Sequence, residues 1–210
     1  MPYNIIINMK ESRKRLFVDK ETGVKERLKI IEKAAGRYDT LVFSAGDKFF
    51  TSKNRNQKYM MMIKHYSFNI EAGGCDFSLL LPSRLFFFHR DLFRMEHGKR
   101  KPRPHFCPTN PQTTSRIKEQ VRYLFGRAIP LMTSPRIFHL LPDEGQKTNW
   151  CSCPACRAFS PAEQYLIAVN AAADMLAVLD PEAVLLYAGF DAEPEAARIM
   201  PRKNTCVADE

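Results

Sequence analysis

Short apolar runs alternate with amphipathic segments along most of this chain. The apolar runs have the length of buried strands, and they occupy residues 4–8, 40–44, 67–71, 136–141 and 184–187. The segments between them carry apolar residues at a spacing of three or four, which predicts helices over about 24–37, 56–65, 111–128 and 161–179. Strands that alternate with helices predict an α/β protein with right-handed crossovers and a parallel sheet.

Two of these helices begin with residues suited to bind free backbone N–H groups. Asn110 stands before Pro111, which is typical of an N-cap followed by proline at the first helical position. Ser160 and Glu163 have the spacing of a capping box. Between the third strand and the helix at 111 lies a long stretch, about 75–110, that is rich in Phe, Pro and Arg. A loop of that size in a compact domain is usually functional or carries small elements of its own.

Five parallel strands fit two architectures, an open doubly wound sheet or part of a (β/α)8 TIM barrel. In both, chemistry gathers at the carboxyl ends of the strands. The unusual residues of this chain follow strands at that end: Gly73, Gly74, Cys75 and Asp76 after the third, 142–145 after the fourth, and Tyr187 at the end of the fifth. We expect one domain over residues 1–190, followed by an irregular tail over 191–210.

Length and charge limit the classes of protein that fit. The chain has 210 residues, which is short for a complete barrel enzyme of about 250 residues. No stretch approaches the roughly 20 apolar residues of a membrane helix, and the N-terminus lacks the pattern of a secretory signal, which favours the cytoplasm and no membrane partner. The net charge is +9, and the excess of Lys and Arg lies in residues 1–150. The densest basic run, 99–103, is broken by prolines and has no interleaved aromatic residues, so nucleic acid is not an expected partner.

The cysteines give the strongest chemical signal. Cys151, Cys153 and Cys156 place three thiols within six residues, and tetrahedral zinc needs a fourth ligand. Cys107 is the best candidate, because it precedes the helix that leads into the fourth strand and therefore lies near the same face. Two alternatives remain open: reduced, packed cysteines without metal, or a redox pair formed by Cys153 and Cys156, which would need to open a helix directly after a strand.

A pair of carboxylates follows the fourth predicted strand. Asp143 and Glu144 could have two separate catalytic roles. One residue would orient a reacting group, and the other, with a raised pKa, would act as general acid. A solvated acidic turn is the alternative. Trp150, the single tryptophan, stands six residues further on. Its ring could stack against a sugar, raise the pKa of a neighbouring carboxylate by desolvation, or simply pack in the core.

Several of these segments together resemble a bacterial domain-of-unknown-function family of the glycoside-hydrolase barrel superfamily, akin to α-glucuronidases and β-hexosaminidases. The resembling segments are residues 71–76, 89–93 with 98–100, 107–111, 142–144 leading into 150–156, and Asn170. The chain is also similar to zinc-containing β-galactosidase barrels, which place a lone cysteine before the helix that leads into strand four and a C-x-C-x-x-C run after that strand. In those proteins all four cysteines bind zinc.

The resemblance implies a partial barrel with a structural zinc ion on Cys107, Cys151, Cys153 and Cys156. It also implies that Glu144 is the acid, with Asp143 as its neighbour. Cys75, Asp76, Trp150 and Tyr187 are the expected substrate-binding residues. Cys75 departs from the family pattern, which has a histidine after the paired glycines, so a sugar-hydroxyl contact is in doubt. The second carboxylate of related barrels comes from a later strand, which this chain lacks.

Three functions follow as hypotheses. The first is a glycosidase, or the N-terminal part of one, that acts on a carbohydrate substrate. The second is a non-catalytic module that binds sugar or needs a partner chain or a missing C-terminal half to complete its barrel. The third is a polyanion-binding protein that uses the basic half of the chain.

Overall fold

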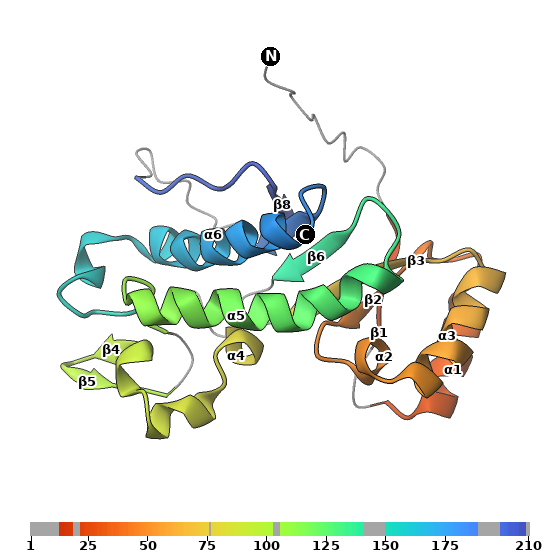
Figure 1. Ribbon diagram of the computed structural model, residues 1–210, viewed down its shortest axis with the longest axis horizontal. Coiled ribbons are helices and arrows are strands. Elements are labelled where there is room, and N and C mark those ends of the chain that lie inside the picture. The colour runs from red at the N-terminus through yellow and green to blue at the C-terminus, as the bar shows by residue number, and fades with distance from the viewer. Residues whose placement is uncertain are drawn as a thin grey trace, which may run out of the picture.

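The computed structural model describes residues 13–18, 22–75, 77–102, 106–140, 150–188 and 198–208. Its centre is a six-stranded sheet (Figure 1). The strands are β1 (Arg15–Val18), β2 (Thr40–Ser44), β3 (Asn69–Cys75), β6 (Ile137–Leu140), β7 (Val184–Ala188) and β8 (Thr205–Ala208). Each strand pairs in parallel with the next along the chain.

The strand order decides between the two architectures that the sequence allowed. The order β1-β2-β3-β6-β7-β8 follows the chain without a reversal, whereas a doubly wound sheet reverses its order at a switch point. A second observation shows that the sheet curls. Two strands separate β1 from β6, so a flat sheet would hold them about 14 Å apart. The rings of Phe17 and His139 nevertheless lie 5.8 Å apart. The chain is therefore a partial TIM-barrel-like α/β domain.

Helices connect the strands, and smaller elements occupy the long stretch after β3. The helices are α1 (Val24–Ala34), α2 (Lys48–Thr51), α3 (Lys53–His65), α4 (Phe77–Leu80), α5 (Pro111–Ala128) and α6 (Pro161–Leu179). The short 3-10 turns are η1 (Ser83–Phe87), η2 (Arg90–Leu92), η3 (Ile129–Leu131) and η4 (Cys156–Ala158), and β4 (Met95–Glu96) pairs with β5 (Lys99–Arg100) in a hairpin. Both predicted helix starts are confirmed: Asn110 accepts a hydrogen bond from the N–H of Gln112, and Ser160 forms a capping box.

The strand predictions need three corrections. The first described strand is β1, which the sequence analysis missed because its four residues begin with an arginine; the run at 4–8 lies outside the described residues. The third strand continues to Cys75 through Gly73 and Gly74. The third correction is β8, which lies where no regular element was expected after residue 191. This strand is defined by its pairing with β7, a long-range interaction that local periodicity does not contain.

The main core lies between the sheet and the helices. Alternate strand residues point to this side, among them Phe43, Ile70, Phe138 and Leu185, and they form one apolar cluster with residues of α2, α3, α5 and α6. Of the described helices, α6 alone is long and apolar enough, by length and composition, to cross a membrane, although Glu163 and Asp174 interrupt its apolar sequence. Since Tyr165, Val169 and Leu176 are fully buried, α6 serves as a core helix.

Candidate metal centre

The four cysteines singled out in the sequence meet in one cluster. The sulfur atoms of Cys107, Cys151, Cys153 and Cys156 all lie within 4.8 Å of one another. The Cys107 sulfur is 3.7 Å from those of Cys153 and Cys156. A tetrahedron of sulfurs around a metal at about 2.3 Å has edges of about 3.8 Å. All four thiols are free and buried, so the cluster could hold one metal ion.

The cluster joins three segments that are distant in the sequence. Cys107 stands between the β4–β5 hairpin and α5, and its N–H donates to the carbonyl of Leu92 over 2.8 Å. The other three cysteines precede α6. Ser152 donates to the carbonyl of Met95 through its N–H and its hydroxyl, each over 2.8 Å. The cysteines therefore staple the hairpin to the segment that leads into α6.

Gln164 of α6 organises the cysteine loop, and the sequence analysis missed it. Its side-chain oxygen accepts from the N–H of Cys151, and its amide nitrogen donates to the carbonyls of Cys151, Cys156 and Phe159 over 3.1 to 3.3 Å. Gln164 is buried, and a buried amide that meets four backbone partners holds the loop in one conformation. The signal in the sequence was a glutamine in the first turn of an otherwise apolar helix.

Donor groups that suit thiolates surround the sulfurs. The N–H of Met95 donates to the sulfur of Cys151 over 3.3 Å, and the guanidinium of Arg100 lies 3.9 Å from that sulfur. The hydroxyl of Thr109 lies 3.1 Å from the sulfur of Cys156. Hydrogen bonds from Cys151 and Cys156, aided by Arg100, lower the pKa of the Cys107 thiol. The hydrogen bonds to Cys107 in turn raise the pKa of Cys151 and of Cys156. The surroundings therefore favour one thiolate, the form that binds metals, at Cys107.

Trp150 and Tyr187, the two aromatic residues expected to contact sugar, lie beside Tyr165 near the carboxyl ends of β6 and β7. Trp150 and Tyr187 are each 8% exposed, and their rings lie 6.2 Å and 6.1 Å from that of Tyr165. The hydroxyl of Tyr165 donates to the carbonyl of Leu140 and accepts from the N–H of Ala188, which ties α6 to the ends of β6 and β7. These rings therefore brace the carboxyl ends of two strands.

The remaining predicted site residues cannot be placed as side chains. Asp76, Asp143 and Glu144 lie outside the described residues, and Cys75 is described only through its backbone, at the end of β3. β6 ends at Leu140, so the acidic pair follows the carboxyl end of that strand.

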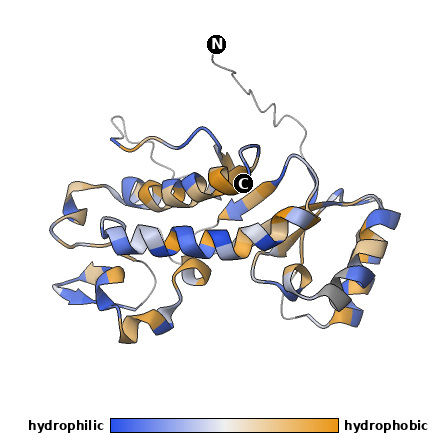
Figure 2. Cartoon of the chain, in the orientation of Figure 1, coloured by the Kyte–Doolittle hydropathy of each residue, from blue (hydrophilic) through white to orange (hydrophobic). Residues whose placement is uncertain are grey.

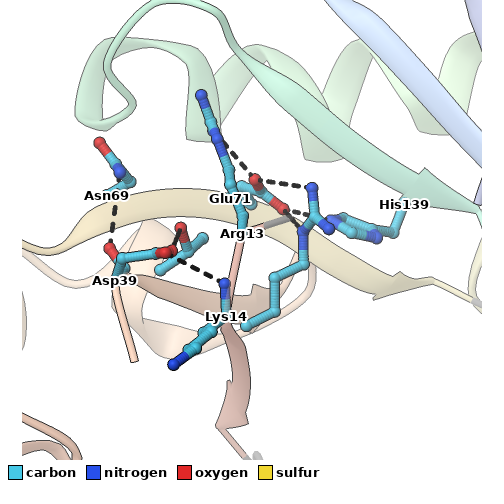
Figure 3. Close-up of polar contacts among 8 residues, drawn as sticks. Arg13, Lys14, Asp39, Asn69, Glu71 and His139 are labelled. Atoms are coloured by element: carbon cyan, nitrogen blue, oxygen red, sulfur yellow. Dashed lines mark hydrogen bonds and ion pairs between the residues drawn. The ribbon is translucent and has the colours of Figure 1, made fainter. Parts of the chain in front are cut away.

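The inner face of the sheet holds a charged network that the sequence analysis missed (Figure 3). The Glu71 carboxylate of β3 is fully buried and accepts from Arg13 over 3.1 Å, from Arg15 over 2.8 Å and from His139 of β6 over 2.6 Å. Burial alone would raise the pKa of Glu71, but the hydrogen bonds from His139 and Arg15 lower it overall. Glu71 and His139 are polar residues inside apolar strands, which was the available signal.

Comparisons with known proteins bear on the fold. No family model and no curated protein matches the chain. Among solved structures, it is similar to one of the tandem GH20 catalytic modules of the pneumococcal exo-β-D-N-acetylglucosaminidase StrH. The TM-score is 0.64 at 10% identity over 93% of this chain and 59% of that one. A second StrH structure, from work on inhibition and N-glycan recognition and hydrolysis, has a TM-score of 0.62 at 10% identity, over 93% of this chain and 57% of that one.

These similarities establish the kind of fold. The chain shares the backbone fold of the StrH structures, and it spans somewhat more than half the length of the chains that it matches. At 10% sequence identity, the match shows that the backbone folds in a similar way, and it does not identify functional residues in this chain.

Proposed function

We propose that this chain forms the first part of a glycoside-hydrolase-like barrel that acts on carbohydrate. The observation that carries the proposal is the match of 93% of the chain to a hexosaminidase catalytic module at a TM-score of 0.64. The sheet has six parallel strands in sequential order, and a closed barrel of this type has eight. Two further strands, from a longer form of the chain or from a partner chain, would complete it.

The proposed chemistry uses the acidic pair that follows β6. Glu144 would protonate the oxygen of the leaving group, and Asp143 would orient the sugar. Cys75 is the last residue of β3, the neighbour of β6, and Asp76 is the next residue in the sequence, so both are proposed to line the same end of the barrel. Trp150 and Tyr187 are 8% exposed, which limits any contact with sugar to a ring edge.

We propose zinc as the metal of the four-cysteine cluster, in a structural role. Four thiolates in tetrahedral positions suit zinc, and a closed shell leaves no open position for substrate. When bound, the ion would supply the positive charge that lets four buried sulfurs be thiolates together. Free thiols are typical of proteins in a reducing compartment such as the cytoplasm, and the free cysteines of the described residues support that proposed location.

A second candidate is a carbohydrate-binding module without hydrolysis. A retaining glycosidase needs a second carboxylate about 5 Å from its acid. Among the described residues of the strands, Glu71 is the carboxylate on the inner face, and Arg13, Arg15 and His139 already bind it. The described sheet therefore offers no free second carboxylate.

A screen of aryl glycosides and a glycan array, on this chain and on any longer form, tests both candidates. If the chain hydrolyses a glycoside, Glu144→Gln should lower turnover by about 10²- to 10⁴-fold while glycan binding persists. The matched control is Glu182→Gln, an exposed glutamate, which should leave the rate unchanged. Binding without turnover would assign the second candidate. The absence of both glycan binding and turnover, in this chain and in any longer form, would refute the proposal.

A further inference from the structure

Two adjacent phenylalanines project from the stretch between β3 and α5. Phe87 is 80% exposed and Phe88 is 86% exposed. They stand at the end of the turn η1, whose Phe86 is anchored by an edge-to-face contact with Phe93 at 5.4 Å. The turn is therefore held against the protein while its last two rings point into water. We call Phe87 and Phe88 the aromatic tip.

Exposed basic side chains lie on the segments next to this tip. Arg84 and Arg90 flank it in the sequence and are exposed, and the Arg90 guanidinium lies 5.6 Å from the ring centre of Phe86. The β4–β5 hairpin adds the exposed Lys99 and Lys101, and it joins the same unit through a hydrogen bond from Arg100 to the carbonyl of Phe93 over 2.6 Å. In Figure 2 the turn at the lower edge of the view carries orange beside the blue hairpin.

Two acidic residues lie nearby in the sequence. Glu96 pairs with Arg94 over 3.2 Å, whereas Asp91 accepts a hydrogen bond over 2.8 Å from the neutral amide of Asn110, which does not offset a negative charge. The four basic residues therefore outnumber one carboxylate that has no ion pair among the described residues. The exposed arginines and lysines around the tip have no carboxylate partner among the ion pairs of the described residues. The surface is thus apolar at its centre and cationic at its rim.

The tip belongs to a firmly held unit. Cys107 binds the carbonyl of Leu92, and Ser152 binds that of Met95, so the cysteine cluster fastens the base from which the tip projects. An exposed pair of large apolar residues on an ordered base costs solubility and is typical of an interaction surface.

We propose that the aromatic tip is a docking site for the surface of an anionic lipid membrane. The two rings would enter the boundary between headgroups and acyl chains, and Arg84, Arg90, Lys99 and Lys101 would lie against the lipid phosphates. Phenylalanine has no polar atom, which favours hydrocarbon over sugar hydroxyls. A convex tip also lacks the walls of the groove in which a single nucleic-acid strand binds. The proposal does not depend on the carbohydrate function.

The sequence favoured no membrane partner, because that expectation depended on spanning segments and secretory signals alone. A peripheral contact needs neither. It needs an apolar tip and a cationic rim on one surface, and the fold brings the two together.

Co-sedimentation of the full chain with vesicles tests the proposal. Vesicles of phosphatidylcholine with about 30% phosphatidylserine should bind the wild type at least roughly 10-fold better than pure phosphatidylcholine, and added salt should weaken binding. The double change Phe87→Ser and Phe88→Ser should lower partitioning by roughly 30-fold or more. Arg84→Gln with Arg90→Gln should lower it by roughly 10- to 30-fold.

The controls separate docking from folding. Met61 of α3 is 73% exposed and lies outside the tip, so Met61→Ser should bind vesicles like the wild type. Because both tip rings are exposed, the double variant should keep the wild-type melting temperature and metal content. Absence of binding to anionic vesicles, equal binding to neutral ones, or full binding by the tip variant would overturn the proposal. Retention on heparin or single-stranded RNA that depends on the tip, without vesicle binding, would also overturn it.

Discussion

The cysteine cluster and the Glu71 network are both buried sets of chemically capable side chains, yet they arise in different ways. The cysteines come from one residue before α5 and a run of six residues before α6. The network draws on residues at or beside β1, on β3 and on β6, and no two of its elements are adjacent in the chain. Local spacing can reveal the first kind of site. The second kind exists only when strands share a face.

The two sites also differ in how their charge is balanced. Glu71 meets two cations within the chain, Arg13 and Arg15, and it also accepts a hydrogen bond from His139. The four cysteines have hydrogen-bond donors and one nearby arginine, which is too little positive charge for four thiolates. The charge of Glu71 is therefore balanced by residues of the chain itself, whereas the cluster could hold four thiolates together only with a metal ion from outside.

The largest effect should come from breaking the cysteine cluster. Cys156 is fully buried, and Cys156→Ser removes one of four ligands. We expect the bound metal to be lost and the free energy of unfolding to fall by at least about 3 kcal/mol. Elemental analysis and urea titration measure the two quantities. Cys206→Ser, on β8 and outside the cluster, should retain the metal. A wild type purified without metal would contradict the expectation.

Removal of the central carboxylate should break the network without an ion being involved. Glu71→Gln leaves Arg13 and Arg15 side by side without their anion. We expect a loss of about 2–3 kcal/mol, less than for a fully buried pair, because the arginine side chains are 24% exposed. Urea titration measures it, with unchanged metal content. The control Glu32→Gln, at an exposed position, should change stability by less than about 0.5 kcal/mol. Equal effects at both positions would argue against the network.

The close packing beside His139 offers a smaller perturbation. A Cβ atom at Gly73 would lie 2.5 Å from Cγ1 of Val42 and 3.1 Å from Cβ and Cδ2 of His139. Gly73→Ala should therefore cost about 1–2 kcal/mol. In contrast, a Cβ atom at Gly126 in α5 would meet its nearest neighbour, Leu179 Cδ2, only at 4.0 Å, so Gly126→Ala should be neutral or stabilising by up to about 1 kcal/mol. Thermal unfolding of the two variants measures the difference, and a neutral Gly73→Ala would refute this packing.

The smallest effect should be on the pH dependence of the free energy of unfolding, at acidic pH. The pKa of Glu71 is lowered in the folded protein, so its stabilising effect is complete above the unfolded value of about 4.3 and is lost as the pH falls through the folded value. Below about pH 4.3 the wild type should lose stability more steeply than Glu71→Gln, by no more than about 1.4 kcal/mol per pH unit. Urea titrations at several pH values measure the slopes, and parallel slopes would contradict the assignment.

The sequence predicted the helices better than the strands. The helices after Asn110 and Ser160 begin where their caps predicted, because capping is a contact between neighbours. β1 and β8 escaped prediction because each has four residues and depends on a partner strand. The roles of Asp143, Glu144, Cys75, Asp76, Trp150 and Tyr187 toward sugar stay predictions.

The sequence by itself determined the four cysteines, the alternation of strands and helices, and the helix starts, because each of these depends on residues close together in the chain. The tertiary structure alone decided the sequential strand order, the meeting of Glu71 with Arg15 and His139, and the aromatic tip beside a basic hairpin. These features depend on which faces and edges the folded chain brings together. Local sequence patterns do not show which side chains far apart in the sequence will meet.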